Sequence, residues 1–151
     1  SEFVVGVRLS PESYEGLPGL DLDESLQVAQ WLCEDGADFL HLSLWDASLD
    51  AKGRPGHHPA RLFRDALPRE VPLVTAGSVW TRAEAEAQLD HGADAVALGR
   101  AAIANPDWPR RVLAEGREPA RFPLSAAELR ERGLGEPFVD YLRGNRGLVR
   151  D

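Results

Sequence analysis

The chain has 151 residues, 43% of them hydrophobic, which suits one domain with a core of its own. Its net charge of −8 argues against a nucleic-acid or anionic-membrane surface, because both call for a basic patch. No apolar run approaches the length of a membrane span, so we expect no membrane partner. The single cysteine, Cys33, excludes an internal disulfide and is compatible with the reducing cytoplasm, which is the expected location.

The first predicted strand covers residues 3–9 (FVVGVRL), which are β-branched and mostly apolar. Arg8 stands near the carboxyl end of this strand. A charged side chain is costly there unless it finds a partner. We therefore expect Arg8 to meet either a ligand or a carboxylate at the rim, and the pattern leaves both open.

A helix is predicted over residues 21–35, because apolar side chains recur at spacings of three and four and a glycine follows. The second predicted strand, residues 38–45 (DFLHLSLW), alternates so that His41 and Ser43 share one face. In a barrel this face can point inward. His41 is then either a residue below a ligand or a hydrogen-bonded interior histidine.

Two adjacent histidines, His57 and His58, lie in a polar loop at residues 46–59, ahead of a short helix predicted over residues 60–67. Adjacent histidines do not have the ligand spacing of a helical metal site, and no Cys, Asp or Glu cluster of ligand spacing accompanies them. We therefore expect no metal site.

The most informative stretch covers residues 71–109, and it predicts two apolar strands, at 72–76 and 94–98, each ended by a glycine. A helix lies between them, opened by Thr81 and Glu84 in capping-box spacing, and a helical turn follows at residues 100–105. Without a Cβ, Gly77 and Gly99 let a ligand approach the main chain, and the second turn aims backbone N–H groups at an anion. Both are equally explained as ordinary turn glycines.

The rest of the chain predicts two further helices. One covers residues 107–115 with Asp107 as its N-cap, and the other is capped by Ser125 with Glu128 in capping-box spacing. Residues 137–151 are predicted to be either a short amphipathic segment or a loose end.

The order of these elements predicts the fold class. Four strands separated by helices form βα units with parallel pairing, and a Gly-Ala-Asp triplet precedes both the second and the fourth strand. A full (β/α)8 barrel takes about 250 residues, so we predict an α/β half-barrel at residues 1–116 with a helical extension at residues 117–151. The sequence has no methionine and begins almost at a strand, which leads us to expect a piece of a longer chain.

Four segments carry a family resemblance: VGVRLSP at 5–11, GADFLHLS at 36–43, VPLVTAGSVWT at 71–81 and ADAVALGRAAIANPDWP at 93–109. Together they resemble the carboxyl-terminal half of the Old Yellow Enzyme family of FMN-dependent NAD(P)H:flavin oxidoreductases. The most specific feature is LGR followed by a small-residue turn and NPD. The resemblance implies a (β/α)8 barrel that holds FMN at the carboxyl ends of its strands and uses NAD(P)H as reductant.

The resemblance also implies roles for individual residues. Arg8 matches the arginine that meets the N1/O2 edge of the isoalloxazine, where a fixed cation stabilises the anionic reduced flavin. Gly77 and Ser78 match the first phosphate-binding turn, with Ser78 in place of the usual second glycine; a serine limits φ there but adds a hydroxyl donor. Gly99 and Arg100 match the second phosphate turn, with Arg100 pairing the phosphate or flanking the ring.

No catalytic residue can be placed in this chain. By the resemblance, the first four strands of the family's barrel carry the histidine pair or His/Asn pair that anchors the substrate, and the tyrosine proton donor. We therefore predict the FMN-binding part of an oxidoreductase that reduces small activated alkenes of enone or dienoyl type, incomplete as it stands.

Two alternatives remain. The chain is a non-catalytic half-barrel that forms a homo-oligomer, or pairs with a missing amino-terminal half-barrel, because open strand edges and an uncovered apolar face favour association. Otherwise it belongs to a different phosphate-binding barrel family that shares the two glycine turns.

Overall fold

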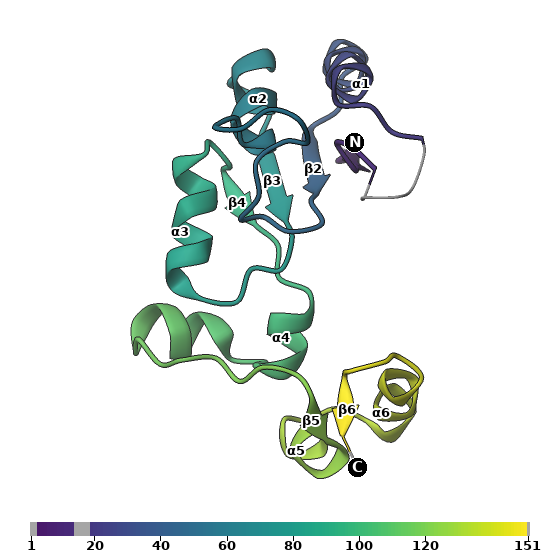
Figure 1. Cartoon of the computed structure of the whole chain (residues 1–151), viewed down its shortest axis with the longest axis vertical. Helices are drawn as coiled ribbons and strands as arrows, with labels where there is room; N and C mark the ends of the chain where they lie inside the picture. Colours follow the sequence, from purple (N-terminus) through teal and green to yellow (C-terminus); the bar gives the residue numbers. More distant parts are fainter. Residues whose placement is uncertain (1–2, 14–18, 151) are drawn as a thin grey trace. The chain divides into compact units, whose positions relative to one another are not determined.

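The computed structural model describes residues 3–13 and 19–150 (Figure 1). They form two compact units. The first comprises the described residues up to Val79 together with Ala83–Leu98, and the second comprises Trp80–Arg82 and the described residues from Gly99 onward. The two units are distinguished by how compactly their residues pack. This does not test the predicted domain boundary after residue 116, which stays a prediction.

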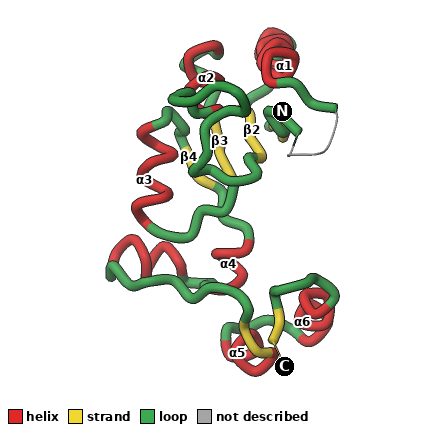
Figure 2. Tube along the Cα trace, viewed as in Figure 1, coloured by secondary structure: helices red, strands yellow, loops and turns green. Residues whose placement is uncertain are grey.

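Strands and helices alternate along the first unit, as predicted (Figure 2). The four strands pair in the order β1-β2-β3-β4, and every pairing is parallel. This confirms the mixed α/β class with a parallel sheet, although the strands are shorter than the sequence pattern predicts. The elements are β1 (Gly6–Leu9), α1 (Leu22–Glu34), β2 (Phe39–Ser43), α2 (Pro59–Ala66), β3 (Leu73–Ala76), α3 (Arg82–Asp90) and β4 (Ala95–Val96).

Helix α1 shows why these elements form where the sequence predicts them. The Asp21 carboxylate accepts hydrogen bonds from the backbone N–H groups of Asp23 and Glu24, which have no partner within the helix. Gly36 follows the helix with φ of +90°, a conformation that favours glycine and ends the helix.

The sheet has one buried face and one open face. Leu40, Leu42 and Leu73 are fully buried, as are Ala29 of α1 and Phe63 of α2. The alternate side chains of the strands form what we call the open face; its members are Arg8, His41, Ser43, Val74 and Ala76, and none of them is buried. The alternation predicted for the second strand is therefore confirmed.

At the amino end of the sheet, the repeated Gly-Ala-Asp triplet has a structural explanation. The Asp38 carboxylate accepts a hydrogen bond from the backbone N–H of Val5, and the Asp94 carboxylate accepts one from that of Leu73, both at 2.7 Å. Each aspartate thus joins the start of its own strand to the preceding strand. Arg64, which is 2% exposed, donates from Nη1 to the Asp94 carboxylate at 3.2 Å.

The second unit consists mainly of helices. Its two short strands, β5 and β6, form a parallel pair. The final residues therefore contain a helix and a paired strand and are not a loose end. The elements are α4 (Arg100–Ala104), a π-helix (Pro109–Ala114), β5 (Leu124–Ser125), α5 (Ala126–Glu131), α6 (Glu136–Arg143) and β6 (Val149–Arg150).

Capping was predicted correctly for one helix of this unit and wrongly for another. Ser125 and Glu128 form the predicted capping box of α5. Asp107 is not an N-cap: the π-helix has Trp108 in that position, with no capping side chain. The Asp107 carboxylate instead accepts hydrogen bonds from the guanidinium groups of Arg110 and Arg111, both at 2.7 Å, so it is engaged by charged donors.

None of the helices in residues 3–13 and 19–150 is both long enough and apolar enough to cross a membrane.

Candidate functional site

Arg8 lies on the open face near the carboxyl end of β1, and its side chain is held by a neighbouring strand. Its Nη2 donates a hydrogen bond of 2.6 Å to the hydroxyl oxygen of Ser43 on β2. Within the described part of the chain, Arg8 forms no ion pair with a carboxylate. Of the two partners that the sequence left open, the rim carboxylate is therefore not observed, and the exposed guanidinium remains able to meet a ligand.

His41 is the register partner of Arg8 in the neighbouring strand. Burial lowers the pKa of its imidazole, and the adjacent Arg8 charge lowers this pKa further, so the neutral form is favoured. Its Nε2 is buried and has no hydrogen-bond partner among the described residues. The alternative of a hydrogen-bonded interior histidine is thus wrong for this nitrogen, and His41 offers Arg8 no negative charge.

The structure gives Gly77 a packing role. A Cβ at this position would lie 2.8 Å from both the Cβ and the carbonyl oxygen of Leu44, and 3.1 Å from the backbone nitrogen of Ala47. That nitrogen donates a hydrogen bond of 2.9 Å to the Gly77 carbonyl. The glycine is therefore required by the packing of the β2–α2 loop, and close approach of a ligand is not needed to explain it.

Ser78 adopts a backbone conformation that favours glycine. Its φ is +52°, the left-handed region that favours glycine. The hydroxyl lies 3.5 Å from the carbonyl oxygen of Trp45. The serine thus keeps the turn geometry at a cost in backbone strain.

The turn at Gly77 is supported by a buried polar cluster that the sequence did not reveal. The carbonyl oxygen of Ala47 accepts hydrogen bonds from Gln88 Nε2 at 2.6 Å and from His58 Nε2 at 3.1 Å. The other ring nitrogen of His58 accepts from the backbone N–H of Ala60 and so caps α2. Burial is the main cause that lowers the pKa of His58, so the ring stays neutral. A histidine N-cap has no strong sequence signal.

His58, one of the two adjacent histidines, packs against a third histidine. His58 stacks on His91 with ring centroids 3.8 Å apart. Among the described residues, no three His, Cys, Asp or Glu side chains are grouped so that they could hold a metal ion.

Gly99 and Arg100 belong to the second unit, so the structure describes their turn separately from the one at Gly77. Gly99 is the N-cap of α4, and its carbonyl accepts hydrogen bonds from the N–H groups of Ala102 and Ile103. A Cβ at Gly99 would meet nothing within 4 Å. Unlike Gly77, Gly99 therefore has open space where a ligand can approach the main chain.

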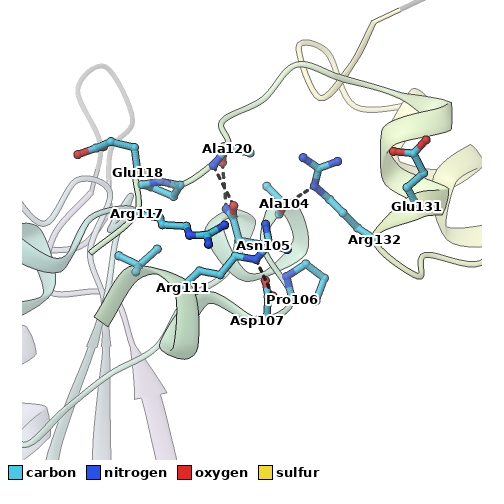
Figure 3. A pocket seen from close by; sticks show the side chains of 12 residues that line it. Ala104, Asn105, Pro106, Asp107, Arg111, Arg117, Glu118, Ala120, Glu131 and Arg132 are labelled. Carbon is cyan, nitrogen blue, oxygen red and sulfur yellow. Dashed lines mark hydrogen bonds and ion pairs between the residues drawn. The ribbon is translucent and has the colours of Figure 1, made fainter. Parts of the chain in front are cut away.

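Each unit also contains a pocket. The pocket of the first unit has a volume of about 340 Å³ and includes Ser43, Leu44 and Trp45 at the carboxyl end of β2. The pocket of the second unit, of about 550 Å³, contains none of the predicted site residues. Its three arginines, 111, 117 and 132, are balanced by Asp107, Glu118 and Glu131, and Glu118 and Glu131 lie at its opposite ends (Figure 3). This pocket has no excess charge to select an anion.

The open face, the glycine turns and the LGR segment all lie within a stretch that matches a known protein family. The profile of the NADH:flavin oxidoreductase / NADH oxidase family matches residues 1–119. The chain belongs to this family. The resemblance to the Old Yellow Enzyme family is thereby confirmed, and the profile favours this family over the alternative of a different phosphate-binding barrel family. The cofactor of the family is FMN, with NAD(P)H as reductant.

Similar proteins include the probable NADH-dependent flavin oxidoreductase YqiG of Bacillus subtilis, which is 38% identical over 97% of this chain and 40% of its own length. The NADH:fumarate oxidoreductase of Klebsiella pneumoniae is 37% identical over 74% of this chain and 12% of its own length. Among solved structures, morphinone reductase in complex with tetrahydroNAD matches 83% of this chain and 32% of its own, with 28% identity and a TM-score of 0.57. The chain thus spans less than half the length of each of these relatives.

Proposed function

We propose that this chain forms the FMN-binding carboxyl-terminal part of an NAD(P)H-dependent oxidoreductase that reduces activated alkenes of enone or dienoyl type. FMN supplies the two-electron transfer chemistry when it is bound. The chain's own contribution is to bind and orient this cofactor. The name of the NADH:fumarate oxidoreductase relative supports an alkene-reducing role, because fumarate is an activated alkene.

The observation that carries the proposal is the guanidinium of Arg8, exposed on the open face and held by Ser43. This group is a fixed cation at the carboxyl end of a parallel strand, which is where barrels of this class bind their ligands. Its donors suit the N1/O2 edge of the flavin, where negative charge accumulates on reduction. His41, its neighbour on the adjacent strand, has a lowered pKa that favours the neutral ring, so it offers Arg8 no opposing charge.

For the phosphate of FMN we propose the turns at Gly77–Ser78 and Gly99–Arg100. Support for the second turn is the open space at Gly99, where a ligand can approach the main chain. Support for the first turn is weaker, because Gly77 is explained by packing and the Ser78 hydroxyl lies near a backbone carbonyl. We therefore expect the second turn to contribute more to phosphate binding.

An FMN titration followed by flavin fluorescence tests this proposal, with riboflavin as the matched ligand that has no phosphate. Arg100→Ala should weaken FMN binding about tenfold and leave riboflavin binding unchanged, since a charge-assisted hydrogen bond to phosphate is lost. Arg8→Gln should weaken both ligands. Arg117→Ala, which removes an exposed arginine paired with Glu115, is the control and should change neither.

A lack of saturable FMN binding by the chain would contradict the proposal for this chain. Equal losses for FMN and riboflavin in Arg100→Ala would contradict the phosphate role of Arg100 while leaving flavin binding intact.

We also propose that the sheet associates with another half-barrel, either a second copy or an amino-terminal half. In the described residues β1 pairs only with β2, and the preceding side chains Phe3, Val4 and Val5 are 86%, 66% and 49% exposed. An unpaired strand edge beside exposed apolar side chains favours association. Light scattering at micromolar concentration should show a dimer or larger oligomer.

Val4→Lys should reduce this association, because a lysine on a strand edge opposes pairing. Trp31→Lys, on the exposed surface of α1, is the matched control and should have no effect. A monomer at micromolar concentration would contradict homo-oligomerisation.

The cytoplasmic location stays a prediction.

A further inference from the structure

Ser43 stands where a side chain can direct Arg8 toward the carboxyl edge of the sheet. The register of the parallel strands pairs Arg8 with His41, and Ser43 lies two residues beyond His41 on the same face. The hydrogen bond from Arg8 Nη2 to Ser43 Oγ, 2.6 Å long, therefore draws the guanidinium forward along the strand direction.

The surroundings of Arg8 leave this hydroxyl as its main restraint. Among the described residues, Ser43 is the one hydrogen-bond partner of the Arg8 side chain. His41 lies beside it as a neutral ring, and the side chains of Val74 and Ala76 on the same face have no polar group. Without the serine, a long exposed arginine side chain would sample many rotamers.

We propose that Ser43 is the positioning residue that holds Arg8 ready for the pyrimidine edge of the flavin. The inference rests on the proposed function, because the partner of Arg8 is the cofactor named there. A donor that is fixed before binding does not have to be ordered when the negative charge develops, so its stabilising effect is larger. Ser43 itself need not touch the flavin.

The first test examines Arg8 in the chain without flavin. The ¹⁵N relaxation of the Arg8 Nε–H group reports how ordered the guanidinium is on the picosecond to nanosecond timescale. Ser43→Ala should make this group mobile, and Ser43→Thr, which keeps a hydroxyl on a β-branched strand residue, should restore the order. Ser48→Ala, which removes a hydroxyl bound to Asp46, is the matched control and should leave Arg8 unchanged.

The second test measures flavin binding with the same variants. Ser43→Ala should weaken riboflavin and FMN equally, by about threefold to tenfold, and should make the potential of the bound flavin more negative. Ser43→Thr should recover most of both effects. A purely structural loss would instead appear as a lower thermal midpoint in Ser43→Ala, with no selective change at Arg8.

The outcomes separate the two proposals. If Arg8 is as ordered in Ser43→Ala as in the wild type, the positioning role is overturned whether or not flavin binds. If Arg8 becomes mobile and the flavin affinity and potential stay the same, the positioning role is likewise overturned. If Arg8 depends on Ser43 but the wild type binds no flavin, the proposed function fails while the restraint itself is confirmed.

Discussion

The two ends of the parallel sheet use their arginines in opposite ways. At the amino end, Arg64 is buried and its guanidinium donates to the carbonyl oxygens of Val71, Leu67 and Pro68 and to the Asp94 carboxylate. At the carboxyl end, Arg8 is exposed and has a single serine hydroxyl as partner. The terminal nitrogens of the guanidinium thus donate to four acceptors at the amino end, where the Arg64 Nε–H has no partner among the described residues, and to a single hydroxyl at the carboxyl end.

This difference separates stability from binding. In (β/α)8 barrels, the carboxyl end of the strands carries the site, and conserved residues at the amino end serve stability. Asp38 and Asp94, which join neighbouring strands, and Arg64 all lie at the amino end. Gly77 shows that packing also sets residue choice at the carboxyl end, because a side chain there would meet Leu44 and Ala47.

Replacing Arg64 and Arg8 by methionine, one at a time, should give the largest difference in stability between the two ends of the sheet. Arg64→Met should lower the free energy of unfolding by about 3 kcal/mol, since it removes the donor of four hydrogen bonds, among them the one to the buried Leu67 carbonyl. Arg8→Met should change this free energy by no more than about 0.5 kcal/mol, because the side chain is exposed and has one neutral partner. Urea unfolding measures both. Equal losses in the two variants would remove the distinction between the two ends.

The turns at Gly77 and Gly99 give the second comparison of stability. Gly77→Ala should lower the free energy of unfolding by about 2 kcal/mol, because the new methyl group would overlap the backbone of the β2–α2 loop. Gly99→Ala should cost less than about 1 kcal/mol, since the methyl group would point into open space. The same urea experiment compares them, and a larger loss for Gly99→Ala would show that its turn is also determined by packing.

Much of the fold could be predicted because it depends on neighbours along the chain. The alternation of β2, the apolar spacing of α1 and the capping box of Ser125 and Glu128 all follow from local spacing. Asp107 was wrongly predicted as an N-cap. It lies just before the helical turn, as a cap would, but its carboxylate accepts hydrogen bonds from two arginines within the next four residues.

The site was harder to predict, because its geometry depends on residues far apart in the sequence. Gly77 looks equivalent to Gly99 until Leu44 and Ala47 are placed beside it. The bond between Arg8 and Ser43 spans 35 positions, and only the strand register brings the two together. The family resemblance named Arg8 as a candidate flavin contact, which stays a prediction, and it carried no information about what holds the side chain.

His58 provides a pH test of the support behind the carboxyl-end turn. Its pKa is lowered below 6.5 in the folded chain, so the unfolded chain takes up the proton first as the pH falls. The contribution of the neutral His58 ring to the stability of the fold is therefore complete above pH 6.5. It is lost as the pH falls through the pKa that His58 has in the folded chain. His91 stacks on the ring, and Asp50 is the nearby carboxylate that opposes the shift.

Comparing urea unfolding at about pH 7.5 and about pH 5.5 should show a loss of stability at the lower pH. His58→Asn, which keeps a capping acceptor and an amide donor, should make this dependence weaker. Some dependence should remain, because the pKa of His41 is also lowered. An unchanged pH dependence in His58→Asn would contradict a role for His58.

Ser78→Gly is expected to have the smallest effect on stability, and its sign is opposite to that of the other substitutions. Glycine relieves the strain of φ at +52° but gains freedom in the unfolded chain, so the net stabilisation should be about 0.5 kcal/mol. Ser48→Gly is the matched control and should destabilise, because Ser48 is not among the non-glycine residues with positive φ in the described chain. The FMN-to-riboflavin affinity ratio of Ser78→Gly then separates the two possible contributions of this turn. A lower ratio would assign phosphate binding to the serine hydroxyl, and an unchanged ratio would assign it to the backbone or to the turn at Gly99.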